Sequence, residues 1–387
     1  MKKMESISSK YMSSITWAGA IQEYKNLAIL PLFSNQSPKA HYIGLNEAMA
    51  KNQIKITEVD EFGSVPTLIA INEGSIPILL LQGEEVEGAM QNRVLNTTIM
   101  LKEHSKTMIP VSCTEEGRWS YRNSGNNFSF REQRLRNQSQ RNDPFRRRNC
   151  TYGPVFQNNS TSDVQDLIDL WDDADTRTEN SENEESDMPI TDGSTTIADS
   201  FTNSYNIMPP LMRKRILSSV STNLEDGGSY RSDQKRVWNE VNLLSHKLQV
   251  QSDTSAINDA FTEKHDTLSE FVEAFHCLPG QQGALVFLNG KVESLDIFSN
   301  ESAYEGYQEK LIKSYTMEAM VTEESNNQKP SHELAEAFIQ NAAHSNESKH
   351  SSVGIGHDYR LQGSEVIGSA LVHEEEVIHI TLLSDSE

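Results

Sequence analysis

Cysteine is scarce in this chain. The 387 residues include three cysteines, Cys113, Cys150 and Cys277. They lie far apart, their number is odd, and none stands in a Cys-x-x-Cys or Cys/His spacing. The pattern argues against a disulfide framework and against a structural zinc site, and it favours a reducing compartment such as the cytoplasm.

Long apolar runs are also missing. The longest one near the start, Leu27–Phe33, is too short to cross a membrane and contains Pro31. Lys2 and Lys3 are not followed by a continuous apolar segment, so no signal peptide is expected. We therefore expect a cytoplasmic protein with no membrane partner.

Basic residues are outnumbered, with 34 Lys and Arg against 56 Asp and Glu and a formal net charge of −22. This balance argues against a nucleic-acid surface over the whole chain, because phosphate contacts need clustered basic side chains. The hydrophobic fraction of 36% is low, which predicts that a sizeable part of the chain is unpacked.

Two charge blocks locate that part. Residues 131–148 contain seven Arg against two acidic residues, and residues 163–199 contain thirteen Asp or Glu against one Arg. Such blocks predict a polar, largely disordered insertion over 122–212. Within it, residues 163–171 carry an amphipathic patch that either docks on a protein partner or is a chance cluster in a spacer.

The N-terminal part reads as β-rich over 26–121, after a loose arm over 1–25. Short apolar or alternating runs joined by polar turns favour an antiparallel sandwich or barrel over βαβ units. Pro110 cannot donate to a ladder, which predicts an edge strand or a bulge. The expected strands are Leu27–Phe33, Ile54–Val59, Thr67–Asn72, Ile76–Leu81, Val94–Leu101 and Thr107–Cys113, with a short helix at Leu45–Ala50.

The C-terminal part, 213–387, reads as helices and hairpins. Asn289-Gly290 is a strong hairpin turn signal between two apolar runs. The predicted fold is therefore α+β, with a β-sandwich or barrel packed against a helix-plus-hairpin region. Helices are expected at Gln234–Leu248, Leu268–Phe275, Tyr304–Met320 and Leu334–Ala342, and strands at Gly283–Phe298, Tyr359–Leu361, Val366–His373 and Glu376–Leu383.

Polar side chains crowd behind the strand Ile76–Leu81. In one interpretation Glu84 or Glu85 is a general base or a Mg²⁺ ligand, since hard cations take carboxylate and amide oxygens. In the other, one of them pairs with Arg93 as a structural salt bridge. Neighbouring strand residues point to opposite faces, so both carboxylates line one pocket only if the turn rotates them.

Other polar residues suggest a ligand site. Gln91, Asn92, Arg93 and Asn96 could hydrogen-bond a phosphate and a ribose, or tie a loop to nearby strands. The remaining candidates are Arg118 and Trp119, which could cap a nucleotide or simply pack, and Arg231, which could reach a phosphate beside the helix N-cap expected at Ser232 or Asp233.

Two residue groups argue against other chemistry. Cys113 lies close to Glu115 and Glu116, whose charge disfavours a thiolate nucleophile. His357-Asp358, His373 and His379 match no metal-ligand motif, which favours ordinary surface histidines.

Four segments resemble one known family. They are LLLQGEEVEGAMQNRVLNTTI, IPVSCTEEGRWSYR, YRSDQKRVWNEV and GALVFLNGKVESLDIF, and they resemble the ARG and rhodanese-phosphatase-superfamily-associated protein domain. The resemblance runs from Leu27 to Leu383, with Gln157–Ile207 as an apparent insertion. Where that family has Asp-Gly-Glu-Glu, this chain has Gln82-Gly83-Glu84-Glu85, so a role for the first carboxylate would be lost.

The family's name records association with ADP-ribosylglycohydrolases and rhodanese-type phosphatases. The resemblance thus implies recognition or processing of an ADP-ribose-type or other phosphorylated nucleotide metabolite. The alternative is a non-catalytic interaction module in which the polar residues only hold the fold. No Gly-rich phosphate loop, HExxH or Ser-based elbow favours an enzyme.

Overall fold

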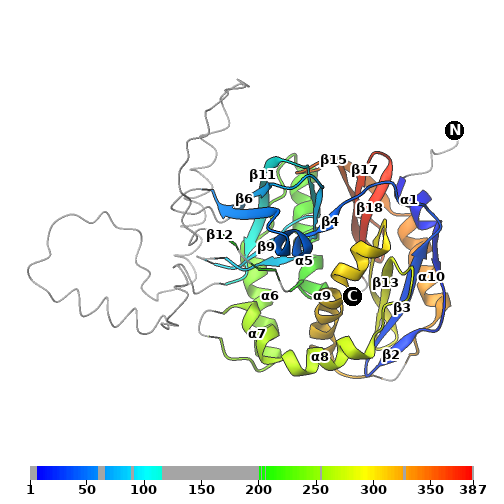
Figure 1. Cartoon of the computed structure of the whole chain (residues 1–387). Helices are drawn as coiled ribbons and strands as arrows, with labels where there is room; N and C mark the ends of the chain where they lie inside the picture. Colours follow the sequence, from blue (N-terminus) through cyan, green and yellow to red (C-terminus); the bar gives the residue numbers. More distant parts are fainter. Residues whose placement is uncertain are drawn as a thin grey trace, which may run out of the picture. The chain divides into compact units, whose positions relative to one another are not determined.

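The computed structural model describes residues 7–59, 66–88, 91–115, 200–201, 203–204, 206–252, 255–325 and 328–385. The chain divides into two units, Met1–Phe130 with Thr196–Glu387, and Arg131–Thr195. All described residues belong to the first unit, so the predicted amphipathic patch at 163–171 lies outside them. The described part is a mixed α+β fold, as predicted (Figure 1).

One large antiparallel sheet joins the two ends of the chain. Strand β3, predicted as Leu27–Phe33, pairs with β13 of the C-terminal hairpin, and β1 and β2 pair with β3 (Figure 1). The strand order is β1-β3-β13-β14-β18-β17-β16-β15. The bounds are β1 (Ile15–Trp17), β2 (Gln22–Tyr24), β3 (Leu27–Ser34), β13 (Gly283–Leu288), β14 (Lys291–Phe298), β15 (Asn346–Ser351), β16 (His357–Gln362), β17 (Val366–His373) and β18 (Glu376–Ser384).

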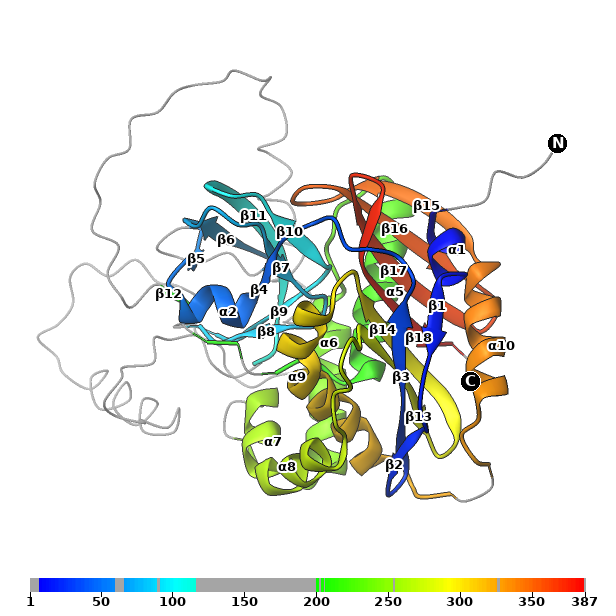
Figure 2. The same ribbon diagram turned by 45° about the vertical axis from the view of Figure 1, so that its right-hand side comes forward.

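Helices cover both faces of this sheet, which explains why its strands β3 and β13 are apolar and buried over most of their length. Leu27 and Ile29 pack toward α8 (His265–Ala274) and α9 (Glu301–Val321). Leu30 and Leu32 pack on the other face with α1 (Ile7–Met12) and α10 (His332–Ala343), which Figure 2 shows on the opposite side of the sheet.

Within the predicted β-rich part, 26–121, residues 43–113 form two smaller sheets around a shared core with α2 (Leu45–Ala50), and residues 200–201 of the predicted insertion add one strand. Their orders are β10-β7-β4 and β12-β5-β6-β11-β9-β8, and all pairs are antiparallel except β4 with β7. The bounds are β4 (Ile43–Gly44), β5 (Ile54–Glu58), β6 (Thr67–Asn72), β7 (Ile78–Leu80), β8 (Glu85–Val86), β9 (Arg93–Leu95), β10 (Ile99–Leu101), β11 (Ser105–Cys113) and β12 (Ser200–Phe201).

The strand predicted at Val94–Leu101 is wrong as a single element. It is divided into β9 and β10, which belong to different sheets. The division falls at polar residues whose side-chain partners lie elsewhere: Nδ2 of Asn96 donates to the Tyr230 carbonyl, and the Thr97 hydroxyl donates to Asp358. Hydrogen bonds to other segments replace the ladder here, because buried polar groups must be satisfied.

Pro110 marks a similar change of partner in β11. This strand pairs with β6 over Ser105–Pro110 and with β9 only over Val111–Cys113. Among the described strands, the β9 side of the ladder therefore begins after the proline, which fits its missing donor.

Helices α5 (Pro210–Glu225), α6 (Gln234–Lys247) and α7 (Ile257–Glu263) share a further apolar core with Val94 and Met317. The prediction of a helix at Gln234–Leu248 is confirmed to within one residue. Asp233 is its N-cap, because its side chain accepts a hydrogen bond from the Arg236 backbone N–H at 3.2 Å.

Two hairpin turns of the large sheet use the same left-handed backbone. Asn289 and Gly290 have φ of 50° and 77°, which confirms the predicted turn. Glu374 and Glu375 occupy the β17–β18 turn with φ of 48° and 64°. Left-handed residues other than Gly cost roughly 1–2 kcal/mol each, so the second turn is strained.

Candidate functional site

The polar residues predicted as a site do come together, but they are buried. We call Gln82, Glu84, Glu85, Gln91, Asn92, Arg93 and Asn96 the polar cluster, and no member is more than 4% exposed. The cluster lies where β8 and β9 meet residues 203–204 and 206–208 and the helices α5 and α9.

Gly83 forms the backbone turn between Gln82 and Glu84 of the polar cluster. Its φ is +84°, and an added Cβ would lie 2.7 Å from Cγ of Arg213. Its backbone N–H donates to the Leu95 carbonyl, and its carbonyl accepts from the Met208 N–H. Only glycine meets both the backbone conformation and the close packing at low cost. The turn sets the directions of the two carboxylates that follow.

Glu84 forms a compensated ion pair. Its Oε1 lies 2.5 Å from Nζ of Lys310 on α9 and accepts the Ser204 hydroxyl at 3.0 Å. Its Oε2 accepts from the Leu81 N–H and the Tyr307 hydroxyl. Burial lowers the pKa of Lys310, while Glu84 opposes that change. All these groups are buried, which is typical of a structural pair.

Arg93 is not the partner of either carboxylate, so that part of the sequence interpretation is wrong. Its Nη1 donates to Oε1 of Gln91 at 3.0 Å, and its Nη2 lies 3.6 Å from Oε1 of Glu58. The alternation of β5 places Glu58 on the buried face of that strand. In this conformation the Arg93 fork is directed at chain residues and not at an open phosphate site.

Cys113 is unsuited to nucleophilic chemistry, as predicted. Its thiol donates to Oε1 of Gln91 at 3.1 Å. Burial, more than the neighbouring acids, raises the pKa of Cys113 to about 11. The thiolate is therefore disfavoured near neutral pH.

Glu85 has a different environment from Glu84. Its carboxylate accepts from the Thr114 hydroxyl at 2.8 Å, Nδ2 of Asn206 at 3.2 Å and Nδ2 of Asn92 at 3.4 Å. All three donors are neutral. Burial raises the pKa of Glu85 to about 7, although the hydrogen bonds to the carboxylate act to lower it. The charge of Glu115 also raises this pKa. This carboxyl is thus poised between its two protonation states at neutral pH.

The remaining predicted residues tie loops together. Nδ2 of Asn96 donates to the Tyr230 carbonyl, and its Oδ1 accepts the Ser112 hydroxyl. Arg231 is half-buried, and its carbonyl accepts from Asn223. Arg118 and Trp119 lie outside the described residues, so their capping role stays a prediction.

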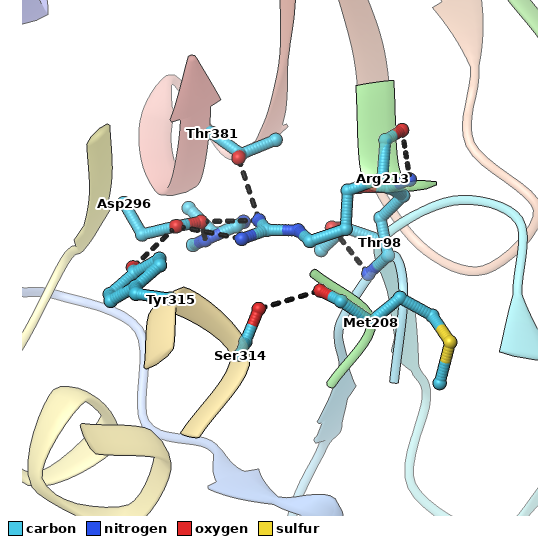
Figure 3. A network of polar contacts seen from close by, with 9 residues as sticks. Thr98, Met208, Arg213, Asp296, Ser314, Tyr315 and Thr381 are labelled. Carbon is cyan, nitrogen blue, oxygen red and sulfur yellow. Dashed lines mark hydrogen bonds and ion pairs between the residues drawn. The ribbon is translucent and has the colours of Figure 1, made fainter. Parts of the chain in front are cut away.

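A second buried network was not predicted from the sequence. Arg213 on α5 donates from Nη1 and Nη2 to Asp296 at 2.9 and 2.6 Å, and from Nη2 to Thr381 (Figure 3). The Tyr315 hydroxyl also donates to Asp296, and Nε2 of His379 lies 3.3 Å away. The network links helices α5 and α9 to β14 and β18, which points to a structural role.

The sequence pattern favoured a surface position for His379, and that prediction is wrong. It is 1% exposed, and burial lowers its pKa although Asp296 opposes that change. Asp358 is also buried, where it accepts from Arg360 and from the Thr97 hydroxyl. His357 is exposed and His373 is half-buried, beside the strained β17–β18 turn.

Among the described residues, neither a metal-binding side-chain group nor a membrane-spanning helix is present. Within the ranges that the structure describes, no group of three or more His, Cys, Asp or Glu side chains could hold a metal ion. None of the helices in those ranges is long and apolar enough to cross a membrane.

The fold and the cluster define an α+β protein with a buried segment rich in acidic and amide side chains. The chain belongs to the family of the ARG and Rhodanese-Phosphatase-superfamily-associated Protein domain, whose family model matches residues 17–188 and 193–383. No curated protein and no solved structure matches the chain. The family description records an association with ARG and the rhodanese-phosphatase superfamily and names no reaction.

Proposed function

We propose that this protein recognises or processes a phosphorylated nucleotide metabolite of the ADP-ribose type, with Glu85 as a general acid–base. The observation that carries the proposal is the pKa of Glu85, raised to about 7 by burial beside neutral donors. A catalytic carboxyl works best with a pKa near the operating pH. Perturbed carboxyls of this kind gather at functional sites.

The surrounding groups suit such a ligand. Asn92 presents its side-chain amide to Glu85, and amides hydrogen-bond ribose hydroxyls and phosphate oxygens. The family description, association with ARG and the rhodanese-phosphatase superfamily, is compatible with such a ligand and names no reaction. Glu84 has no catalytic part here, because Lys310 compensates its charge.

A second candidate, a non-catalytic interaction module, is favoured by the burial of the cluster. Glu85 is only 3% exposed, so a ligand reaches it only if a covering segment moves. The side-chain amides of Gln82 and Asn96 donate to the backbone carbonyls of Arg213 and Tyr230. Under this function the cluster holds the fold and a surface elsewhere binds a protein.

The test is a thermal-shift screen of the purified chain with ADP-ribose, NAD, nucleotides and sugar phosphates, each with and without Mg²⁺. A ligand at 100 times its Kd raises the stability by about 2.7 kcal/mol. The informative variant is Glu85→Gln, which keeps shape and removes titration. Glu293→Gln is the matched control, because burial also raises the pKa of Glu293 to about 7 and Glu293 lies on β14, outside the cluster.

The proposal expects a ligand-induced shift and turnover in the parent chain and in Glu293→Gln, and loss of turnover in Glu85→Gln. A panel without any shift, or turnover that survives Glu85→Gln, would favour the interaction module. Arg93→Ala is a poor probe, because it leaves the buried Glu58 without the partner that lies 3.6 Å away.

A further inference from the structure

The hairpin turn between β13 and β14 carries a chemically reactive pair of residues. Asn289-Gly290 is the one Asn-Gly pair in the sequence. An asparagine followed by glycine loses its amide more readily than other asparagines, because glycine has no side chain to hinder attack by its own backbone nitrogen. The turn needs this pair for its shape, since Asn289 and Gly290 have φ of 50° and 77°. The turn therefore brings a modification chemistry with it.

The Asn289 side chain holds the segment that follows α9. We call residues 322–325 the exit segment, because α9 ends at Val321 and the chain then leaves it toward α10 on the opposite face of the large sheet (Figure 2). Nδ2 of Asn289 donates to the Glu323 carbonyl at 2.8 Å, and its Oδ1 accepts from the Ser325 backbone N–H at 2.9 Å. These partners assign the amide orientation, because only the nitrogen donates.

The backbone of the turn is held as well. The N–H of Asn289 donates to the Asn26 carbonyl at 2.8 Å, and Nδ2 of Asn26 donates to the Ala319 carbonyl near the end of α9. A Cβ added to Gly290 would collide with the carbonyl oxygen of Gln328. The turn and the chain around the end of α9 thus pack as one unit. Asn289 is half-buried in this unit, so water still reaches it.

Deamidation of an Asn-Gly pair needs no reactant except water. The glycine backbone nitrogen, after losing its proton to solvent, attacks Cγ of the asparagine. The new C–N bond closes a five-membered succinimide ring, and the side-chain nitrogen leaves as ammonia. Water then adds to one of the two ring carbonyls and breaks its C–N bond, which gives aspartate or isoaspartate.

The exit segment opposes this reaction. Ring closure turns the Asn289 side chain onto the nitrogen of Gly290, so both hydrogen bonds to the exit segment must break first. We propose that Asn289 is a deamidation site restrained by the exit segment, which reacts when residues 323–325 detach. The aspartate product cannot donate to the Glu323 carbonyl when it is ionised, so the modified chain holds this segment less firmly. The site is independent of Glu85.

The test follows the amide by mass spectrometry of peptides. The full chain is incubated at pH 8.5 in heavy-oxygen water, which labels each hydrolysed succinimide, both folded and unfolded in urea. Asn52 is the internal control, because it is exposed and has a φ of 53° like Asn289, but Gln53 follows it. Ser325→Pro removes one N–H donor, and Asn289→Gln removes the five-membered ring.

We expect labelled product at Asn289 in the folded chain and none at Asn52. The unfolded chain should react about tenfold faster at Asn289, which corresponds to losing two hydrogen bonds of ordinary strength. Ser325→Pro should react about threefold faster than the parent, and Asn289→Gln should give no product. Asn289→Asp should be cleaved faster than the parent by a glutamate-specific protease after Glu323, because the exit segment opens more often. Asn52→Asp should be cleaved there at the parent rate.

Four results would overturn the inference. The first is no labelled product at Asn289 in the folded chain, and the second is equal rates in the folded and unfolded chains. The third is a folded Ser325→Pro variant that reacts at the parent rate. The fourth is unchanged cleavage after Glu323 in Asn289→Asp. A thermal unfolding curve confirms that each variant is folded, and the urea comparison needs no variant at all.

Discussion

Replacing Glu85 by Gln should change how stability depends on pH. The pKa of Glu85 is raised from 4.5 to about 7 in the folded chain. A raised carboxyl pKa means that the folded state prefers the protonated form. Its contribution to stability is fully present below about pH 4.5 and is lost as the pH rises through about 7.

The magnitude follows from the shift. The difference between 4.5 and about 7 is about 2.5 pKa units, and each unit corresponds to about 1.4 kcal/mol. Ionising Glu85 in the folded chain therefore costs about 3 kcal/mol at high pH. That is a large part of the 5–15 kcal/mol that stabilises a typical domain. Gln stays neutral at every pH, so Glu85→Gln escapes this loss.

The assay is urea unfolding of both proteins at pH 5.5, 7 and 8.5. Between pH 5.5 and pH 8.5, Glu85→Gln should gain about 2 kcal/mol of stability relative to the parent, because the parent loses that much as Glu85 ionises in the folded state. Glu293→Gln provides a second measurement, because the pKa of Glu293 is also raised to about 7. Comparing variants at each pH removes the contributions of His379 and Lys310, which both proteins share.

One outcome would refute the reasoning. If the free energy of Glu85→Gln runs parallel to that of the parent from pH 5.5 to 8.5, while Glu293→Gln departs from it, the folded carboxyl has an ordinary pKa. The acid–base role of Glu85 would then lose its physical basis.

Three further changes test the rest of the structure by the same unfolding assay. Asp296→Asn should cost about 3–5 kcal/mol, because it leaves Arg213 buried without its counter-charge; a loss below 1 kcal/mol would contradict the pairing. Gly83→Ala should cost clearly more than Gly227→Ala, since both have positive φ but only Gly83 packs on a side chain; equal losses would contradict that packing. Glu375→Gly should stabilise the chain by about 1 kcal/mol by relieving its left-handed backbone, and a loss would show that the turn is unstrained.

Local signals predicted much of the fold. The helix at Leu45–Ala50, the strand at Thr67–Asn72 and the Asn289-Gly290 turn agree with the structure at their bounds. Each depends on periodicity or turn chemistry within a few residues, which is where sequence patterns carry the most information.

Other elements were not predicted from the sequence, because the interactions that form them are not local. Strand β15, Asn346–Ser351, is polar throughout and forms because β16 offers it a ladder. The run Val94–Leu101 has the apolar pattern of one strand, but Asn96 and Thr97 find partners in distant segments and divide it. Tertiary hydrogen bonds decided both cases against the local pattern.

In the candidate site, too, some features follow from local sequence and others depend on distant residues. The polar cluster lies within one segment of the sequence, but two partners of its carboxylates, Lys310 and Asn206, lie far along the chain. Lys310 was recognisable in principle: it follows Tyr307 and precedes Leu311 on the apolar stripe of α9. A lysine on a buried helical face requires a buried acid, since an unpaired charge there is too costly. Asn206, by contrast, carries no such pattern.

Glu84 and Glu85 are the same residue type at adjacent positions, and both are buried, so composition and burial cannot separate them. Their partners do. Lys310 lies 2.5 Å from Glu84 and holds that carboxylate in place, whereas the donors of Glu85 are neutral and the pKa of Glu85 rises to about 7. A proton can therefore leave and return at Glu85 near neutral pH at little cost, which acid–base chemistry requires. Substitution at Glu84 would instead leave Lys310 unpaired and report on stability alone. Any reaction at this cluster should therefore depend on the second glutamate and not on the first.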